Sequence, residues 1–269
     1  MIKLTDLLKE ITSKPKAIIM AGGASVGKST ILKTIDSQLK GFENLNADKY
    51  VEDKDSPMFG NLSAASTQIR KKDLPSAIEA KRNLIYDTTA SNLSTLQPTL
   101  DMLNEGGYDV MMIMVYAHPI VSFLRNFKRE RKVPKMAVLS TWNSVYGSID
   151  TYKAKLGDNF IMYQAPDEEF AKEISGFNSA VKAGKLYDWF NDLTDQDQDA
   201  FKSTLGTKST EPLSPDEQAK KDKAKEKQSE VYKQQVEQME REFSNIDNKI
   251  KNYVLTEQEI ISKVKSFAS

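Results

Sequence analysis

The fold is decided by the stretch Ala17-Ile18-Ile19-Met20-Ala21-Gly22-Gly23-Ala24-Ser25-Val26-Gly27-Lys28-Ser29-Thr30. In it a short apolar run leads into the pattern G-x-x-x-x-G-K-S, and a helical pattern follows over residues 30–35. Strand, glycine-rich loop and helix in this order predict a phosphate-binding loop, because backbone N–H groups gather at the helix N-terminus, where the helix dipole favours an anion. A chance glycine-rich turn is the alternative, but the complete motif in this context favours nucleotide binding.

Each part of the loop has an expected role. Lys28 is expected to reach the β- and γ-phosphates of ATP, and the Ser29 hydroxyl is expected to bind Mg²⁺. ATP and Mg²⁺ are therefore the expected cofactors. The expected nucleotide-binding residues are Gly22, Gly23, Ala24, Ser25, Val26, Gly27, Lys28, Ser29 and Thr30.

Composition excludes several other classes of protein. The chain has 269 residues, 38 basic and 38 acidic side chains, and no cysteine. The balanced charge indicates no particular partner, and the lack of cysteine excludes a disulfide framework, a thiolate nucleophile and a cysteine metal site. Charged residues interrupt the N-terminal segment, so it is not expected to be a signal peptide, and no apolar run is long enough to cross a bilayer. We expect a cytoplasmic protein with no membrane partner.

Five apolar runs predict the strands of one sheet. They cover residues 17–21, 42–47, 83–87, 109–117 and 159–164. Helical patterns lie between them, and this alternation favours right-handed βαβ units and a mostly parallel sheet. The sequence therefore predicts an α/β fold.

A change of composition after residue 205 predicts the domain organisation. Residues 1–205 are the expected catalytic domain, and an amphipathic helix is expected at residues 3–13. Residues 206–215 are rich in Gly, Ser, Thr and Pro and are expected to form a linker. Residues 216–269 are expected to form a helical tail, in which a long charged helix precedes a short one with a capping-box pattern at Thr256.

The long tail helix carries apolar residues at alternating spacings of four and three, which we call the heptad seam. One interpretation is a helix packed against the chain's own body, and the other is a coiled coil with a second copy or a partner protein. The flexible linker gives the helix reach, which slightly favours a contact beyond its own domain. The seam consists of Tyr232, Val236, Met239, Phe243, Ile246, Ile250 and Tyr253.

Two predicted strands end near a carboxylate. Asp48 follows the second strand, where it could accept a proton from a substrate hydroxyl that attacks the γ-phosphate. It could equally serve as a helix N-cap. Asp87 ends the third strand and is the expected outer partner of Mg²⁺, although such a residue can also stabilise the turn that follows.

A basic segment over residues 125–134 predicts a lid. Arg125 and Arg129 are spaced i, i+4 on one helical face, where they could stabilise the charge of the transferring phosphoryl group and close over it. A solvated basic helix surface is the alternative interpretation. His118, the only histidine, has no serine or carboxylate motif beside it and is expected to be structural.

These motifs, in this order and near this spacing, resemble the zeta-toxin and polynucleotide-kinase-like P-loop kinases. The resemblance covers residues 17–166 and rests on the loop of residues 21–30, on Asn46-Ala47-Asp48-Lys49-Tyr50, on residues 84–89 and on residues 125–134. It implies a three-layer α/β/α sandwich with a five-stranded parallel sheet. It also implies Asp48 as general base and Arg125 and Arg129 as lid arginines, with Arg131 as a further candidate.

The favoured function is an ATP- and Mg²⁺-dependent kinase with an alcohol group as acceptor. The acceptor is a nucleic acid 5′-hydroxyl or a small molecule such as a UDP-sugar or nucleoside. Members of the family that phosphorylate nucleic-acid ends often have an arginine soon after the base aspartate, whereas Lys49 and Tyr50 follow it here. Residues 60–79, where this family usually selects its substrate, show no pattern that we can assign. The alternatives are a P-loop NTPase module that acts mainly through interactions of its helical tail, and an inactive scaffold, which the intact Lys28 and Ser29 disfavour.

Overall fold

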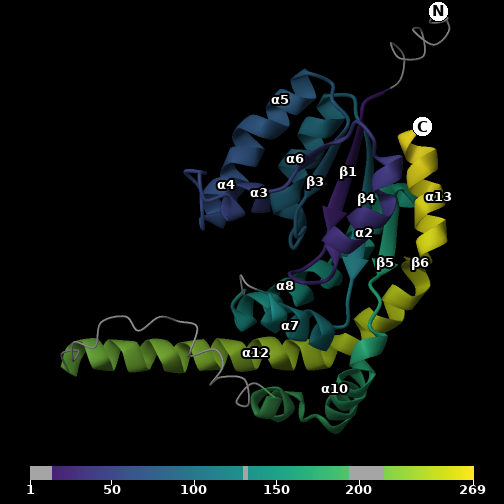
Figure 1. Cartoon of the computed structure of the whole chain (residues 1–269). Coiled ribbons are helices and arrows are strands. Elements are labelled where there is room, and N and C mark those ends of the chain that lie inside the picture. Colours follow the sequence, from purple (N-terminus) through teal and green to yellow (C-terminus); the bar gives the residue numbers. More distant parts are fainter. Residues whose placement is uncertain (1–13, 130–132, 194–214) are drawn as a thin grey trace, which may run out of the picture.

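A parallel sheet forms the centre of the molecule (Figure 1). The computed structural model describes residues 14–129, 133–193 and 215–269. Six strands lie in the order β2-β3-β1-β4-β5-β6, and every neighbouring pair is parallel. The strands are β1 (Lys16–Ala21), β2 (Glu43–Leu45), β3 (Leu84–Asp87), β4 (Asp109–Tyr116), β5 (Phe160–Gln164) and β6 (Val254–Leu255).

The five predicted strands are present, and the tail adds a sixth. β1 and β4 lie in the middle of the sheet and are buried almost throughout, as expected for strands that are covered on both faces. β6 pairs with β5 through Met162 opposite Val254 and Tyr163 opposite Leu255. The sequence did not predict β6 because a strand of two residues has no detectable alternation.

Helices cover both faces of the sheet. Right-handed connections place α2, which follows β1, on one face and the later crossover helices on the other. α13 packs against α2 and β5 and so lies on the face of α2, while α6 and α9 pack against β4. The helices are α2 (Lys28–Ile35), α3 (Asp48–Glu52), α4 (Leu62–Gln68), α5 (Leu74–Glu79), α6 (Leu93–Glu105), α7 (Pro119–Lys128), α8 (Lys135–Gly147), α9 (Ile149–Leu156), α10 (Ala171–Ala183), α12 (Pro215–Tyr253) and α13 (Glu257–Ala268).

Helix ends follow local chemistry. The Asn92 side chain accepts a hydrogen bond from the Ser94 N–H at the start of α6. α6 stops just before Gly106 and Gly107, the second of which has a φ of 76°, a conformation that favours glycine. The capping box at Thr256 and Glu259 opens α13, as its sequence pattern predicts.

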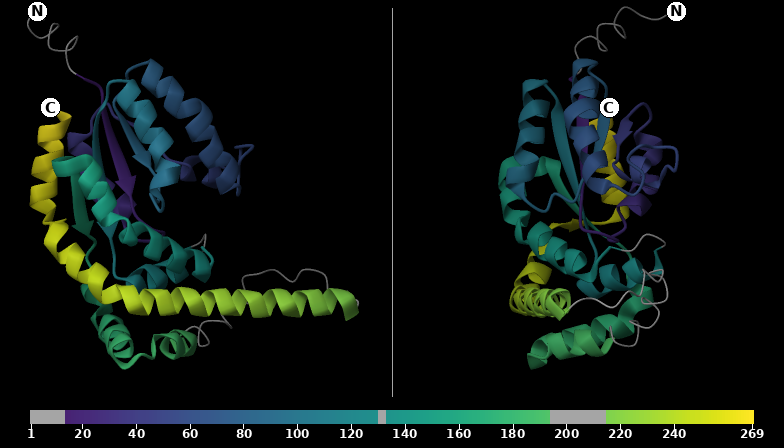
Figure 2. Two further views of the ribbon diagram at one scale, coloured as in Figure 1. Left: turned by 180° about the vertical axis from the view of Figure 1, so that it is seen from behind. Right: turned by 90° about the vertical axis from the view of Figure 1, so that its left-hand side faces the viewer.

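The tail packs on the body of its own chain. α12 runs beside α8 and continues through β6 into α13, which climbs along the edge of the sheet (Figures 1 and 2). Tyr253 is partly buried, and the other six residues of the heptad seam are buried in the same core as the sheet. The heptad seam therefore packs against the body of its own chain. The slight preference, from the sequence, for a contact of the seam beyond its own domain was wrong.

Some expected segments lie outside the part of the chain that the structure describes. These are the N-terminal helix at residues 3–13 and residues 206–214 of the linker. Among the helices that are described, none combines the length and the apolar character needed to cross a membrane.

Candidate active site

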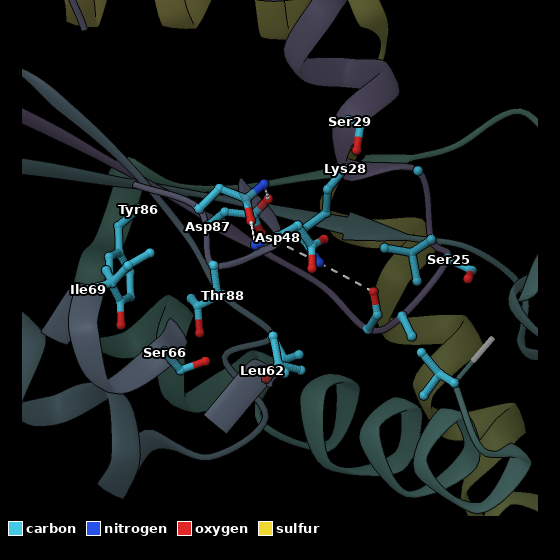
Figure 3. A pocket seen from close by; sticks show the side chains of 18 of the residues that line it. Ser25, Lys28, Ser29, Asp48, Leu62, Ser66, Ile69, Tyr86, Asp87 and Thr88 are labelled. Carbon is cyan, nitrogen blue, oxygen red and sulfur yellow. Dashed lines mark hydrogen bonds and ion pairs between the residues drawn. The ribbon is translucent and has the colours of Figure 1, made fainter. Parts of the chain in front are cut away.

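A cavity of about 590 Å³ opens at the carboxyl ends of β1, β2 and β3 (Figure 3). This is the edge at which parallel α/β sheets bind ligands. The loop between β1 and α2 lines one end of the cavity, and α4 with the turn after it lines the other. Asp48 and Asp87 lie between these two ends, beside Lys28 (Figure 3).

The loop between β1 and α2 has the backbone that its glycines predict. Gly22 has a φ of 140°, and a Cβ atom there would lie 2.7 Å from the carbonyl oxygen of Val115. Gly27 caps α2 with a φ of 101°. A side chain at either position would be strained, so these two glycines allow the loop to wrap closely at the helix N-terminus.

Lys28 is held inside the loop. Its Nζ donates to the carbonyl oxygen of Gly22 at 2.9 Å and lies 3.6 Å from a carboxylate oxygen of Asp87. The two side chains are only 16% and 12% exposed, so the ion pair is poorly screened by solvent. An ammonium group at this place can turn from the loop carbonyl to an incoming phosphate.

Asn46 connects the backbone of Asp48 with the side chain of Asp87. Its side-chain oxygen accepts from the backbone N–H of Asp48 at 2.9 Å, and its side-chain nitrogen donates to Asp87 at 3.3 Å. Burial raises the pKa of the Asp87 carboxyl, Lys28 opposes that shift, and the Asp48 carboxylate adds to it. Asp48 is the first residue of α3, and the N-cap is Ala47, whose side chain accepts no hydrogen bond. The geometry therefore differs from the N-cap interpretation of Asp48.

The residues of this edge fit a magnesium ion. Ser29 lies in the first turn of α2 and Asp87 ends β3, and both line the cavity. The described residues contain no group of three or more His, Cys, Asp or Glu side chains that could hold a metal. In phosphoryl transfer Mg²⁺ usually takes one or two protein oxygen ligands and completes its shell with phosphates and water, and a hydroxyl and a carboxylate are donors of that kind.

Both predicted lid arginines line the cavity at the loop end. Arg129 donates to the Ser25 hydroxyl at 3.4 Å. Arg125 donates to the carbonyl oxygen of Pro166, and its guanidinium carbon lies 5.6 Å from the centre of the Phe170 ring. A purely solvated basic surface does not describe these two side chains. Arg131 lies outside the described residues.

The other end of the cavity has side chains that the sequence did not single out. A single turn of π-helix over Ile69–Asp73 follows α4, and such turns are frequent at functional sites. Arg70 of this turn lines the cavity, as do Ser66, Ile69 and Tyr86 (the last three in Figure 3). The basic run of residues 70–72 was the one available signal, and it did not reveal that Arg70 alone of the three borders this cavity.

His118 lies away from the cavity. Its Nδ1 accepts from the backbone N–H of Ile120 at 3.4 Å and so caps α7. The ring lies between Phe177 and Phe243 in edge-to-face contacts, with centroid distances of 4.7 and 5.1 Å. Burial lowers the pKa of His118 to about 4. These contacts agree with the structural role predicted for it.

A model of the family described as Zeta toxin matches residues 3–156. No curated protein sequence matches the chain. The match includes the loop of residues 22–30, both aspartates and both lid arginines, and it ends before α10 and the tail.

Solved structures with a similar arrangement share little sequence with the chain. A structure of the PezAT toxin-antitoxin system of Streptococcus pneumoniae is 14% identical, with a TM-score of 0.45, 60% of this chain and 75% of that one being covered. A chain of the Pnkp1/Rnl/Hen1 RNA repair complex is 20% identical, with a TM-score of 0.43, and the match covers 58% of this chain and 53% of that one. Shikimate kinase from Acinetobacter baumannii, in complex with shikimate, is 14% identical, with a TM-score of 0.38, and the match covers 66% of this chain and 99% of that one.

Proposed function

The chain belongs to the zeta-toxin family of P-loop phosphotransferases, and from this premise we propose that it is an ATP- and Mg²⁺-dependent kinase that phosphorylates a hydroxyl group. One observation carries the proposal: a nucleotide loop, two carboxylates and two arginines meet in a single cavity. Nucleotide binding alone requires only the loop. A carboxylate pair on the far side of Lys28 is the additional chemistry that transfer to an acceptor requires.

In the proposed reaction Asp48 accepts the proton of the acceptor hydroxyl. The acceptor oxygen forms a bond to the γ-phosphorus, the bond from that phosphorus to the β–γ bridging oxygen breaks, and ADP leaves. Lys28, Arg125 and Arg129 stabilise the negative charge that spreads over the phosphoryl oxygens. Ser29 and Asp87 would hold a Mg²⁺ ion, which would supply positive charge to balance the phosphates of ATP.

The acceptor end of the cavity supports an acceptor that carries a phosphate close to its hydroxyl. Within the described residues, the one hydrogen bond that Arg70 donates goes to the Ser66 carbonyl oxygen at 3.4 Å, and Arg70 has no ion pair. An arginine of this kind suits a phosphate oxygen. Leu62, Ile69 and Tyr86 add apolar surface suited to a ring. Among the acceptors considered above, a UDP-sugar or a polynucleotide end has both features, whereas a free nucleoside has only the ring.

The alternative, an NTPase module that acts through its helical tail, has weaker support. Its partner would need the apolar face of the tail, and the chain's own body covers that face. Acceptor-dependent turnover distinguishes the two functions, since the alternative requires none.

The test is incubation with γ-labelled ATP and a panel of 5′-hydroxyl RNA, 5′-hydroxyl DNA, nucleosides and UDP-sugars. We expect the label to move to a phosphate-bearing member of the panel, with acceptor-dependent release of ADP. Lys28→Ala serves as the control and should lower the rate by a factor on the order of 10² or more while the fold is retained. ADP release that is independent of every acceptor would favour the NTPase alternative.

A further inference from the structure

α8 lies between the tail and the nucleotide loop. On its loop side, the Tyr146 hydroxyl donates to the carbonyl oxygen of Val115 at 2.7 Å. That carbonyl is the group that leaves no room for a Cβ atom at Gly22. Five residues earlier, the Thr141 methyl group lies 3.7 Å from the position that a Cβ atom of Gly23 would take. α8 therefore forms part of the surface on which the loop rests.

α8 begins next to the end of the predicted lid. Asn126 of α7 is buried, and its side chain makes two hydrogen bonds to the backbone of Val133, one to the oxygen at 2.8 Å and one from the nitrogen at 2.9 Å. These bonds tie Val133, four residues after Arg129, to α7. α8 starts two residues after Val133, at Lys135. A shift of α8 would therefore reach the base of the lid as well as the loop.

α8 also packs against α12. The Asn143 side-chain nitrogen donates to the backbone oxygen of Gln235 at 3.1 Å and to its side-chain oxygen at 3.3 Å. The Lys135 ammonium lies 4.3 Å from the centre of the Tyr232 ring. These polar contacts have defined directions, so they fix the position of α8 along α12 more closely than apolar packing alone would.

We propose that the tail is a positioning element for catalysis: Gln235 and Tyr232 hold α8, and through it the loop and the lid arginines, in the geometry that phosphoryl transfer needs. The proposal rests on the kinase function above and concerns residues that lie beyond the family match at 3–156. Its physical basis is that small displacements of aligned groups greatly reduce the rate of transfer, although the binding of ATP changes little.

The test compares two neighbouring glutamines of the full chain. Gln235→Ala removes the side-chain acceptor for Asn143, while Gln234→Ala alters an exposed residue whose side chain, among the described residues, donates to Glu230 on its own helix. We expect Gln235→Ala to lower the single-turnover rate about tenfold with little change in ATP affinity, and Gln234→Ala to change neither. Gln235→Glu keeps an acceptor oxygen and should retain most of the activity. Equal rates for Gln234→Ala and Gln235→Ala in folded protein would overturn the proposal.

A double-mutant cycle separates positioning from a loss of stability. If Gln235 acts through the lid, Gln235→Ala should lower the single-turnover rate much less in a protein that already carries Arg129→Ala than in the wild type. Additive effects would contradict the proposal. If Gln235→Ala proves unstable at the assay temperature, Lys135→Gln removes the contact with Tyr232 from a partly exposed site, and it should also lower the rate but not the affinity.

Hydrogen exchange gives a measurement that needs no acceptor. Gln235→Ala should speed amide exchange at residues 22–29 and 126–138, whereas Gln234→Ala should not. If exchange changes in this way but no acceptor in the panel is phosphorylated, the proposed function is wrong, whereas the structural coupling between the tail and the loop is confirmed. Unchanged exchange together with a normal rate would reject the link itself.

Discussion

At the scale of single residues, the site depends on a few side chains that α/β topology brings to one edge. The carboxyl ends of parallel strands meet there, so Asp48, after β2, and Asp87, at the end of β3, lie close together although the residues are far apart in sequence. Asn46 fixes this pair by binding both. The arrangement makes the role of Asp48 testable by a change that preserves its shape.

Asp48→Asn should keep the volume of the side chain but remove its capacity to accept a proton. We expect phosphoryl transfer to fall steeply, by a factor on the order of 10² to 10⁴, while ATP affinity stays near that of the wild type. Single-turnover kinetics beside a nucleotide titration measures both quantities. A change in melting temperature with normal turnover would mean that Asp48 has only a structural role.

His118 should make stability depend on pH. Its pKa is lowered to about 4 by burial, below the value of about 6.5 expected in the unfolded chain. The unfolded state therefore binds more protons between these values, and the free energy of unfolding should fall as the pH drops from about 6.5 to about 4, by at most about 3 kcal/mol.

Urea titrations at several pH values measure this slope. His118→Asn does not titrate and keeps an acceptor at the start of α7, so its stability should depend less on pH in that window. Parallel curves for the two proteins would show that other groups cause the dependence.

The residues of the site were predictable to different degrees. Lys28 and Asp87 stand in or beside strong patterns, and the structure brings them into the same cavity. Arg70 and Asn46 were missed for physical reasons. The position of Arg70 depends on a π-helical turn that no periodicity reveals. The bond from Asn46 to Asp87 joins two strands that are adjacent only after folding.

At the scale of elements, five strands and their parallel arrangement could be predicted because apolar runs and helical patterns alternate clearly. The same reasoning failed for β6, whose two residues pair with β5 only because the tail returns to the sheet. It also failed to decide where the heptad seam packs, since a stripe with this spacing suits a second chain or the own body equally. The surface that covers the stripe is built by residues far away in the sequence.

One buried side chain, that of Asn126, connects the start of the predicted lid with its end at Val133. Asn126→Ala would leave the N–H and C=O groups of Val133 without their partners, at a cost of about 1–3 kcal/mol for each buried group that stays unpaired. We expect a lower melting temperature and a lower transfer rate, because the segment with Arg129 loses its fixed base.

Asn126→Asp provides the comparison for this change. It keeps the acceptor for the Val133 N–H and loses the donor to the Val133 oxygen, so its melting temperature and rate should lie between those of the wild type and Asn126→Ala. If Asn126→Ala loses stability but transfers phosphate at the normal rate when folded, the clamp has no part in positioning the lid.

At the scale of the whole molecule, the tail is energetically part of the domain that it covers. Six seam side chains are buried, and each large apolar side chain contributes about 1.5–3 kcal/mol on burial. Their sum is on the order of 10 kcal/mol, which is comparable to the net stability of a whole domain. Phe243 shows the connection, since its ring contacts His118, Trp142 and Phe177 of the body.

A chain shortened to end at Leu205 should therefore be unstable or insoluble, although every proposed catalytic residue precedes that point. The domain boundary predicted from composition implies instead that the shortened chain is soluble and active. Expression of the shortened chain decides between these two expectations. The boundary signal in residues 206–215 is a composition of linker type, and such a composition does not report where the chain goes afterwards.

The complementary fragment makes this last prediction sharper. If the tail contributes by covering the body, residues 229–269 supplied as a separate chain during refolding should restore a soluble complex and its phosphoryl transfer. The same fragment with Phe243→Ala should restore less, because it lacks the ring that packs beside Trp142. Light scattering on the full chain adds a check, since a seam that is already buried predicts no dimer through that face. A soluble, active chain ending at Leu205 would show that the tail is not needed for the stability of the domain.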